Sequence, residues 1–492
     1  MERMSTLDAG FYFIEHENTP MHVGSVLLFE GPPPSYGDLV RLLAGKLHKV
    51  PRYRQRVRTV PLHLGRPAWV DDEHFEILYH VRHTAVPTPG GTEQLRNLAG
   101  RVFAQRLDMA KPLWELWLVE GLQDNRWAAI SKVHHCMIDG MAGWDLAAML
   151  LDLTPDAEHP AVPDGWSARP APSRSELIAG GVRDAVGAPL QQLSRVPQLA
   201  RTVLRPDKLL TFGRGLPGTA RRLGGNTARS LNGPSGPHRR WEWTQADLGE
   251  IKRIRGEFGG TVNDVVLAAV TRGFRDLLAG RGELVEGQMV RSLVPVSVRS
   301  REEKGLLNNR VSGVLVNLPV GETDPVKRLE LLREQMDDVK NSQQAIGAQA
   351  LTELAGFAAP TLLALGTRVA MRFPQPVMQT ATTNVPGPRF PLYLLGRRMV
   401  EVHPYVPIAN NILTAIGIFS YLDQLNFGIT GDFDAVPDIG VLAAGIRAGV
   451  DELLDRVATP AQPVPVKKAK KVPAKKVAKS AVKRPATAAP DG

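Results

Sequence analysis

The residues best suited to chemistry gather in one short stretch, SKVHHCMIDGMAG, at residues 131–143. His134 and His135 are adjacent, Asp139 follows four positions after the second histidine, and Gly140 comes next. Side chains alternate along a strand, so adjacent histidines at a strand end point to opposite faces. Such a pair is poorly placed to share a metal ion, because H-E-x-x-H zinc sites put both histidines on one helical face. We therefore expect no metal here, and one histidine that faces a channel.

A histidine in such a place can act as a general base. Its ordinary pKa of about 6.5 leaves the imidazole mostly neutral at pH 7, able to take a proton from a hydroxyl or thiol. Asp139 could then orient the loop by pairing with an arginine, and Gly140 would let the backbone pass close to the site. The spacing alone allows a structural, hydrogen-bonded histidine pair as well, so it leaves this choice open.

Other chemistries find little support in the sequence. There is no G-x-S-x-G elbow of a serine hydrolase, and the Gly-Lys pair at residues 45–46 is followed by leucine, not by the Ser or Thr of a P-loop. The G-x-G-x-x-G match at residues 213–218 contains a proline and leads into no βαβ unit. Cys136, the only cysteine, is expected to be a small core residue. A single thiol excludes an intrachain disulfide and suits a reducing compartment.

Two apolar strands are predicted to carry the histidines into place. Residues 113–122 and 126–135 have the composition of strands, and a Gln-Asp-Asn turn joins them. A third strand is expected at 21–31, and helices are expected at 36–50, 91–108 and 143–153. Residues 1–155 therefore predict an α/β unit.

A second α/β pattern begins at residue 241, after a Pro-, Gly- and Arg-rich linker at 156–239 that includes a helical stretch at 174–193. We expect Thr244 to cap a helix at 244–259, and Asn263 or Thr261 to cap the next helix, which ends at residue 280. The remaining predicted elements are strands at 289–298, 310–320, 380–384 and within 411–430, and helices at 324–342 and 438–456.

The net charge of +10 is concentrated in the tail. Residues 461–492 contain nine Lys or Arg and one acidic residue, so the body of the chain is nearly neutral. Such a tail is expected to be disordered. Each basic residue contributes roughly 1 kcal/mol of attraction to an anionic membrane. Nucleic-acid binding and a purely solvated tail are the competing interpretations.

No membrane-spanning or secretory segment is predicted. The N-terminus has no basic segment followed by an apolar one, as a signal peptide would. The most apolar run, at residues 354–367, has 14 uncharged residues, fewer than the ~20 that span a bilayer. It is predicted to be a buried or amphipathic core helix, with an interfacial membrane helix as the alternative.

The sequence HHCMIDG resembles the HHxxxDG signature of the bacterial wax ester synthase/acyl-CoA:diacylglycerol acyltransferase family, part of a larger group of CoA-dependent acyltransferases. A series of further stretches resembles the family in the same order, from about residue 5 to residue 455. They are residues 7–26, the Pro-Leu-Trp element at 112–114, LNGPSGPHRR at 231–240, the Asn-Asp pair at 263–264, VPVSVR at 294–299, SGVLVNLPVGETDP at 312–325 and TNVPGP at 383–388.

The resemblance implies an α/β fold of two chloramphenicol-acetyltransferase-like domains, each a mixed sheet with flanking helices. They would occupy residues 1–155 and 240–460, joined by the linker at 156–239, and the Lys-rich tail at 461–492 lies outside the resemblance. A channel would run between the domains, with His135 near its middle, CoA entering from one side and the lipid acceptor from the other.

The resemblance also implies roles for individual residues. His135 is the expected general base and His134 its neighbour, while Asp139 would be a loop brace whose hypothetical partner is Arg299. Three more residues are substrate or oxyanion candidates with structural alternatives. They are Asn263, for which a plain N-cap is the alternative, Asp264, a favourable charge at a helix start, and Trp114, which is more typical of a core.

The implied activity is acyl transfer from acyl-CoA to diacylglycerol, which makes triacylglycerol without a cofactor, acyl-CoA being a co-substrate. Wax ester synthesis with a long-chain alcohol is the alternative, as are a condensation-type activity and a non-catalytic protein bound to lipid surfaces or nucleic acid. We expect a cytoplasmic enzyme, peripheral on the inner face of the plasma membrane or on lipid inclusions. The motifs indicate neither the acceptor preference nor the oligomeric state.

Overall fold

Six strands form the sheet that carries the histidine pair, in the order β12-β13-β2-β7-β6-β5. The computed structural model describes residues 2–61, 64–137, 150–159, 161–162, 165–193, 228–297, 311–341, 378–409 and 411–457. The strand bounds are β12 Tyr393–Leu394, β13 Arg397–Tyr405, β2 His22–Glu30, β7 Arg126–His134, β6 Trp114–Leu122 and β5 Val81–Ala85. β5 runs parallel to β6 and the other neighbours are antiparallel, so the sheet is mixed, as predicted.

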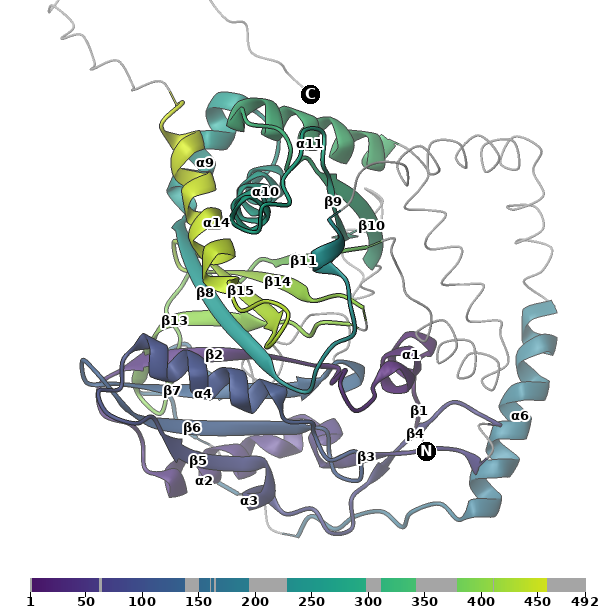
Figure 1. The fold of residues 1–492 in the computed structure, drawn as a ribbon. Helices are drawn as coiled ribbons and strands as arrows, with labels where there is room; N and C mark the ends of the chain where they lie inside the picture. The colour runs from purple at the N-terminus through teal and green to yellow at the C-terminus, as the bar shows by residue number, and fades with distance from the viewer. Residues whose placement is uncertain are drawn as a thin grey trace, which may run out of the picture. The chain divides into compact units, whose positions relative to one another are not determined.

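Different helices cover the two faces of this sheet (Figure 1). The helices are α1 Thr6–Ile14, α2 Tyr36–Lys46 and α4 Thr92–Ala104. α4 turns Leu95, Ala99 and Val102 toward one face at the i, i+4, i+7 spacing of a helical stripe. α1 and α2 pack against the other face through residues such as Phe13 and Leu39. Alternation along β7 therefore decides which side chains meet α4 and which meet α1.

The second sheet has the order β10-β9-β11-β14-β15-β8 and is also mixed, because β11 runs parallel to both of its neighbours. Its strands are β8 Arg239–Asp247, β9 Val290–Ser297, β10 Val311–Leu318, β11 Thr380–Val385, β14 Thr414–Tyr421 and β15 Gln424–Asp432. The helices α9 Leu248–Phe258, α10 Val262–Gly280, α11 Pro325–Asn341 and α14 Ile439–Leu454 share an apolar core with it. They lie on one side of the sheet (Figure 1).

Smaller elements complete the described part of the chain. A three-stranded sheet has the order β1-β4-β3, with β1 Glu2–Arg3, β4 Ala68–Asp71 and β3 Gln55–Arg58. The remaining helices are α3 Ile77–His80 and α6 Arg174–Leu193, and the 3-10 turns are η1 Leu47–Lys49, η2 Pro51–Arg54, η4 His135–Met137 and η5 Arg229–Leu231.

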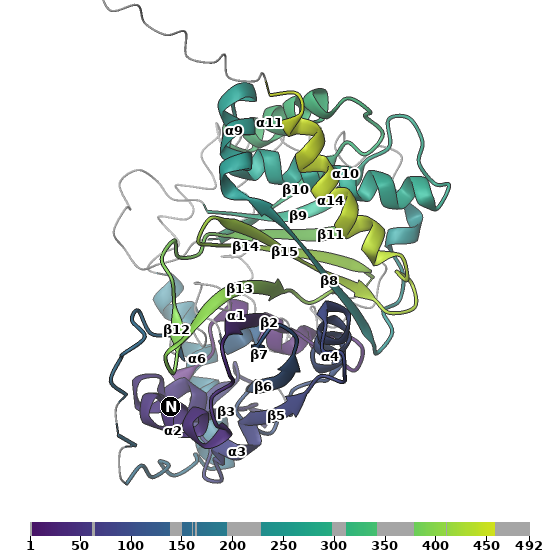
Figure 2. The ribbon, with the colours of Figure 1, turned by 90° about the vertical axis from the view of Figure 1, so that its left-hand side faces the viewer.

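Two strands of the second half of the sequence, β12 and β13, complete the first sheet. β13 pairs with β2, with Tyr405 opposite Gly24, although some 380 positions separate them in the chain. Figure 2 shows β13 between β2 and the β14–β15 pair of the second sheet. β13 approaches β15 so closely that a Cβ on Gly428 of β15 would lie 1.6 Å from the carbonyl oxygen of Pro404 in β13. Only glycine therefore fits at position 428. These contacts make residues 1–457 one compact unit.

Most predicted elements are confirmed, with one correction. The helix α9 is capped by Asp247 and not by Thr244, which lies inside β8. Asp247 and Glu250 form a reciprocal capping box that fixes this start. Of the two caps proposed for α10, Thr261 is confirmed. The predictions for residues 354–367, for the tail at 461–492 and for most of the helix at 143–153 fall outside the described residues.

Candidate active site

His135 stands where β7 ends and the 3-10 turn η4 begins. Its backbone N–H donates to the carbonyl oxygen of Met21 at 2.8 Å, which ties the turn to the residue before β2. Its ring stacks on Phe11 of α1, with ring centroids 3.8 Å apart and planes inclined by 21°. A backbone bond and a stacking partner therefore hold the half-buried imidazole from two directions.

His134 makes a separate set of contacts, as the alternation of a strand predicts. Its Nδ1 atom accepts the backbone N–H of Cys136 at 3.1 Å, so the proton is on Nε2, which donates to Oε2 of Glu15 at 2.9 Å. Neither side chain is exposed beyond 2%. The same Glu15 oxygen accepts the backbone N–H of Met21 at 2.9 Å. One buried carboxylate thus holds both His134 and the segment that binds the backbone of His135.

Glu15, His134 and His135 together form the histidine corner. Its electrostatics favour a neutral His135. Burial lowers the pKa of the His135 imidazole to about 4, the neighbouring His134 side chain contributes in the same direction, and the backbone of His135 opposes them. Burial alone would raise the pKa of Glu15. The hydrogen bonds from His134 and Met21 and the charge of Arg106 bring it below its ordinary value instead. At neutral pH the corner holds an ionised carboxylate and an unprotonated His135.

Cys136 is buried, as predicted, in the apolar cluster that also contains Phe13 and Trp114. Burial raises the pKa of its thiol well above the usual range, so it is no nucleophile at neutral pH. The chemistry available at this corner is therefore that of the imidazole.

Three of the predicted site residues fall outside the described part of the chain. They are Asp139, Gly140 and Arg299. The brace between Asp139 and Arg299 stays a prediction.

Asn263 and Asp264 lie in the first turn of α10, and each has a definite partner. Asp264 completes a capping box, since its Oδ2 accepts the backbone N–H of Thr261 at 2.7 Å while the Thr261 hydroxyl accepts the N–H of Asp264 at 3.3 Å. Asn263 is not the cap. Its Oδ1 accepts an N–H of the Asn384 side chain at 3.3 Å. Asn384 is the last residue of the strand predicted at 380–384, and it lies in β11, paired with Ile418.

The end of β11 brings this second group of residues toward the first. Val385 follows Asn384 and packs against the apolar cluster that includes Cys136 and Met137, the two residues after His135. The loop beyond it is held at Gly387, whose N–H donates to the Ser420 hydroxyl at 2.9 Å. Val385, the neighbour of Asn384, and the histidine corner therefore border one large apolar cluster that both halves of the sequence build.

Trp114 is a core residue. It is fully buried, its indole N–H donates to the carbonyl of Tyr53 at 2.8 Å, and it stacks on His80 with centroids 4.6 Å apart. These contacts use both its face and its polar edge, which accounts for the residue without a substrate.

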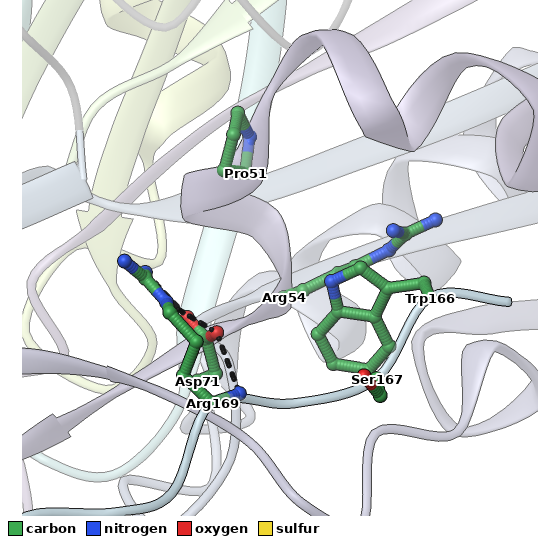
Figure 3. Close-up of a pocket in the computed structure, with 6 residues that line it drawn as sticks. All are labelled: Pro51, Arg54, Asp71, Trp166, Ser167 and Arg169. Carbon is green, nitrogen blue, oxygen red and sulfur yellow. Dashed lines mark hydrogen bonds and ion pairs between the residues drawn. The ribbon is translucent and has the colours of Figure 1, made fainter.

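A pocket of about 350 Å³ lies away from these residues. It is lined by Pro51, Arg54, Asp71, Trp166, Ser167 and Arg169. Figure 3 shows the Trp166 indole beside Arg54, whose guanidinium carbon lies 4.9 Å from the ring centre. Arg169 holds both oxygens of Asp71, at 2.9 and 3.0 Å. None of the predicted site residues lines this pocket.

Four residues of the site escaped sequence reasoning. They are Phe11, Glu15 and Met21, which hold the histidines, and Asn384, which holds Asn263. The first three lie in the stretch 7–26 that carries the family resemblance, and Asn384 lies in TNVPGP. Their positions in these motifs were the available signal, and their partners could not be read from local patterns.

Comparison with known proteins identifies two matching family profiles. That of the wax ester synthase/diacylglycerol acyltransferase catalytic domain matches residues 4–266, and that of the WS/DGAT C-terminal domain matches residues 307–454. A probable diacylglycerol O-acyltransferase of Mycobacterium tuberculosis is 36% identical over 474 residues, covering 92% of this chain and 96% of the relative.

Solved structures agree with this comparison. The wax ester synthase/diacylglycerol acyltransferase from Marinobacter aquaeolei VT8 has a TM-score of 0.64 and 26% identity, covering 92% of this chain and 98% of that one. The first condensation domain of the calcium-dependent antibiotic synthetase has a TM-score of 0.57 and 15% identity, covering 93% and 97% of the two chains. This second likeness concerns the fold alone, and it supports the predicted two-domain α/β architecture.

Proposed function

Because the chain belongs to the wax ester synthase/diacylglycerol acyltransferase family, we propose that it transfers a fatty acyl group from acyl-CoA to the free hydroxyl of diacylglycerol. The products are triacylglycerol and CoA. The observation that carries this proposal is the half-buried, neutral imidazole of His135, fixed by Met21 and Phe11 at the end of β7. The reaction needs no cofactor, because acyl-CoA itself is the activated donor.

His135 acts as the general base. It takes the proton of the acceptor hydroxyl as the oxygen attacks the thioester carbonyl carbon, and a tetrahedral intermediate forms. The intermediate collapses by breaking the C–S bond, and the imidazolium gives its proton to the departing CoA thiolate. No acyl-enzyme forms, which agrees with the protonated, buried state of the Cys136 thiol.

The negative oxygen of the intermediate needs hydrogen-bond donors, and the side-chain amide of Asn263 supplies one. Its Oδ1 already accepts from Asn384, so its Nδ2 is the end left to donate. The position of Asn263 in the first turn of α10 adds the favourable end of the helix dipole. Asp264, by contrast, caps this helix.

His134 has a positioning role in this proposal. It is fully buried and both ring nitrogens are engaged, so it does not face a substrate. In this proposal Asp139 pairs with Arg299 and orients its loop, and Gly140 lets the backbone pass close to the site.

The choice of acceptor lies in the shape of the site, since a long-chain alcohol undergoes the same chemistry and gives a wax ester. The relative from Mycobacterium tuberculosis is named for diacylglycerol, and this favours the glycerolipid as the acceptor. Labelled acyl-CoA, offered separately with diacylglycerol and with a fatty alcohol, measures the preference.

Substitution of the base tests the mechanism. The His135→Ala variant is expected to lose about 10²- to 10⁴-fold in kcat, the contribution typical of a general base. His74→Ala is the matched control, because His74 is exposed and follows a different strand. Full turnover by His135→Ala, or a loss confined to His134→Ala, would show that the base is wrongly chosen.

We also propose that the enzyme attaches peripherally to the inner face of the plasma membrane or to lipid inclusions, where its acceptor resides. Among the helices that the structure describes, none is long and apolar enough to cross a membrane. The nine Lys and Arg residues at 461–492 supply the attraction to anionic lipid.

Truncation after Pro460 tests the attachment. The truncated chain is expected to lose co-sedimentation with anionic liposomes at low salt, while the full chain is released only at high salt. Unchanged liposome binding would refute the tether, and binding to DNA in preference to liposomes would support the nucleic-acid alternative.

A further inference from the structure

We propose that Asn384 is a positioning residue that determines which end of the Asn263 side-chain amide faces the reacting oxygen. The proposal rests on the proposed function, because it gives Asn263 its role at the oxyanion. It concerns a residue on another element, β11 of the second sheet, that acts through Asn263.

The contact itself is directional. Nδ2 of Asn384 donates to Oδ1 of Asn263 at 3.3 Å, so the oxygen end of Asn263 is turned toward β11. A carboxamide has one accepting and one donating end on opposite sides. Fixing the first therefore points the second away from β11. Without this contact the amide could rotate by half a turn and present oxygen to a negatively charged intermediate.

The two side chains rest on rigid supports. Asn384 lies in β11, the strand between β9 and β14, opposite Ile418, which is 1% exposed. Asn263 is fixed at its backbone by the capping box of Thr261 and Asp264. With both backbones held, the side-chain torsions of Asn263 are the remaining freedom, and the hydrogen bond from Asn384 restrains them.

The neighbour of Asn384 in β11 connects this strand to the first half of the chain. Val385, the next residue of β11, packs against the apolar cluster that contains Cys136 and Met137 beside the base. The half of the chain that supplies His135 and the half that supplies the amide pair thus meet at one cluster.

An Asn384→Asp substitution tests the inference, because aspartate keeps the shape of asparagine but can only accept hydrogen bonds. Asn263 would then donate its Nδ2 to the carboxylate introduced on β11 and turn its own oxygen toward the intermediate. We expect kcat to fall by about 10- to 100-fold, somewhat less than the full loss of an oxyanion donor. KM for acyl-CoA and the thermal unfolding midpoint should stay near those of the native enzyme.

Asn384→Ala and the control Thr382→Val sharpen the test. Alanine leaves the Asn263 amide free to adopt either orientation, so its loss in kcat should be smaller than that of aspartate. A side chain that matters only for packing predicts the reverse order. Thr382 is two residues earlier on the same face of β11 and is buried, bonded to Ser292. The isosteric Thr382→Val change should leave kcat within about twofold, since a buried change away from the reacting atoms acts on stability.

A double-mutant cycle with Asn263→Ala tests whether Asn384 acts through the side-chain amide of Asn263. Once the Asn263 amide is gone, Asn384→Asp should change kcat by less than about twofold. An equal loss in both backgrounds, or a fully active Asn384→Asp enzyme, would overturn the inference. If Asn384→Asp fails to fold, the Asn384→Ala cycle gives the same decision. Failure of the proposed function is separate, because it would appear as absent acyl transfer in the native enzyme or an active His135→Ala variant.

Discussion

The two groups of candidate site residues are held in different ways. At the end of β7, His134 and His135 are fixed by a buried carboxylate, Glu15, whose charge is satisfied by three kinds of donor: an imidazole, a backbone N–H and a guanidinium. In the first turn of α10, Asn263 is fixed by a neutral amide, and only Asp264 of the capping box carries a charge. Buried charged hydrogen bonds are stronger than neutral ones and cost more to break.

The difference follows from the task of each group. A general base must stay unprotonated and must keep one ring orientation, which requires a dry and rigid surrounding. An oxyanion donor has only to present an N–H group, and a neutral amide does so at any ordinary pH. The contribution of the histidine corner to stability should therefore be sensitive to substitution and to pH, and that of the amide group much less so.

The largest expected effect is that of Glu15→Ala. Removing the carboxylate leaves Nε2 of His134 and the N–H of Met21 buried without their acceptor, so we expect a loss of about 3 kcal/mol in the free energy of unfolding. The kcat should fall as well, because Met21 holds the backbone of His135. Denaturant unfolding and the acyl-transfer assay measure the two effects.

Two further variants give this prediction its controls. Glu15→Gln keeps an accepting oxygen and should lose less than half as much stability. Glu17→Ala changes an exposed glutamate two positions along, and should stay within about 0.5 kcal/mol of the native protein. Equal stability of Glu15→Ala and Glu17→Ala would remove the contrast between the two groups.

The next effect concerns pH. The folded-state pKa of His135 is about 4, below its unfolded value of about 6.5, so the base stays active on acidification until the pH approaches 4. We expect the acidic limb of kcat/KM near this value, with little loss at pH 6. An acidic limb near pH 6.5 would mean that the imidazole is as solvated as a free histidine, and would contradict the geometry of the corner.

Stability changes with pH in the same sense. Between about pH 6.5 and 4 the unfolded chain binds a proton at His135 that the folded chain does not, so stability falls as the pH is lowered through this window. Glu15 adds to the loss at lower pH, because its folded-state pKa lies below its ordinary value and its favourable contribution disappears as it protonates. Unfolding midpoints measured along a pH series should show both losses of stability, that from His135 and that from Glu15.

Sequence patterns predicted the elements whose signals are local. β2, β6, β7 and the helices α2, α4 and α10 follow from composition, periodicity and caps. β8 was partly misread as the start of a helix, although Trp241 and Trp243 alternate with polar residues as in a strand. β13 was not predicted, since it contains Pro404 and its partner β2 lies far away in the chain. Pairing over that distance leaves no local trace.

The site residues also divide into those with a local sequence signal and those without one. His135 could be predicted because its motif is contiguous, whereas Glu15 lies 119 positions before its partner His134. The segment at 380–385 has the polar sequence TATTNV, and the strand predicted at 380–384 is confirmed. It forms a strand because buried hydroxyls find partners across the sheet: Thr380 donates to the carbonyl of Thr414, and Thr382 accepts from Ser292. Only the tertiary structure shows such partners.

The smallest effect is expected at Asp264, and it sets the scale for the amide group. Asp264→Ala removes the acceptor of the Thr261 N–H, and the loss of such a cap costs about 1 kcal/mol. The other oxygen, Oδ1, is buried without a partner among the described residues, so removing the carboxylate also removes an unsatisfied group, which offsets part of the cost. Asp264→Asn, which keeps one acceptor, should lose still less. A loss at Asp264→Ala as large as that at Glu15→Ala, measured by denaturant unfolding, would mean that the first turn of α10 depends on buried charge as much as the histidine corner does.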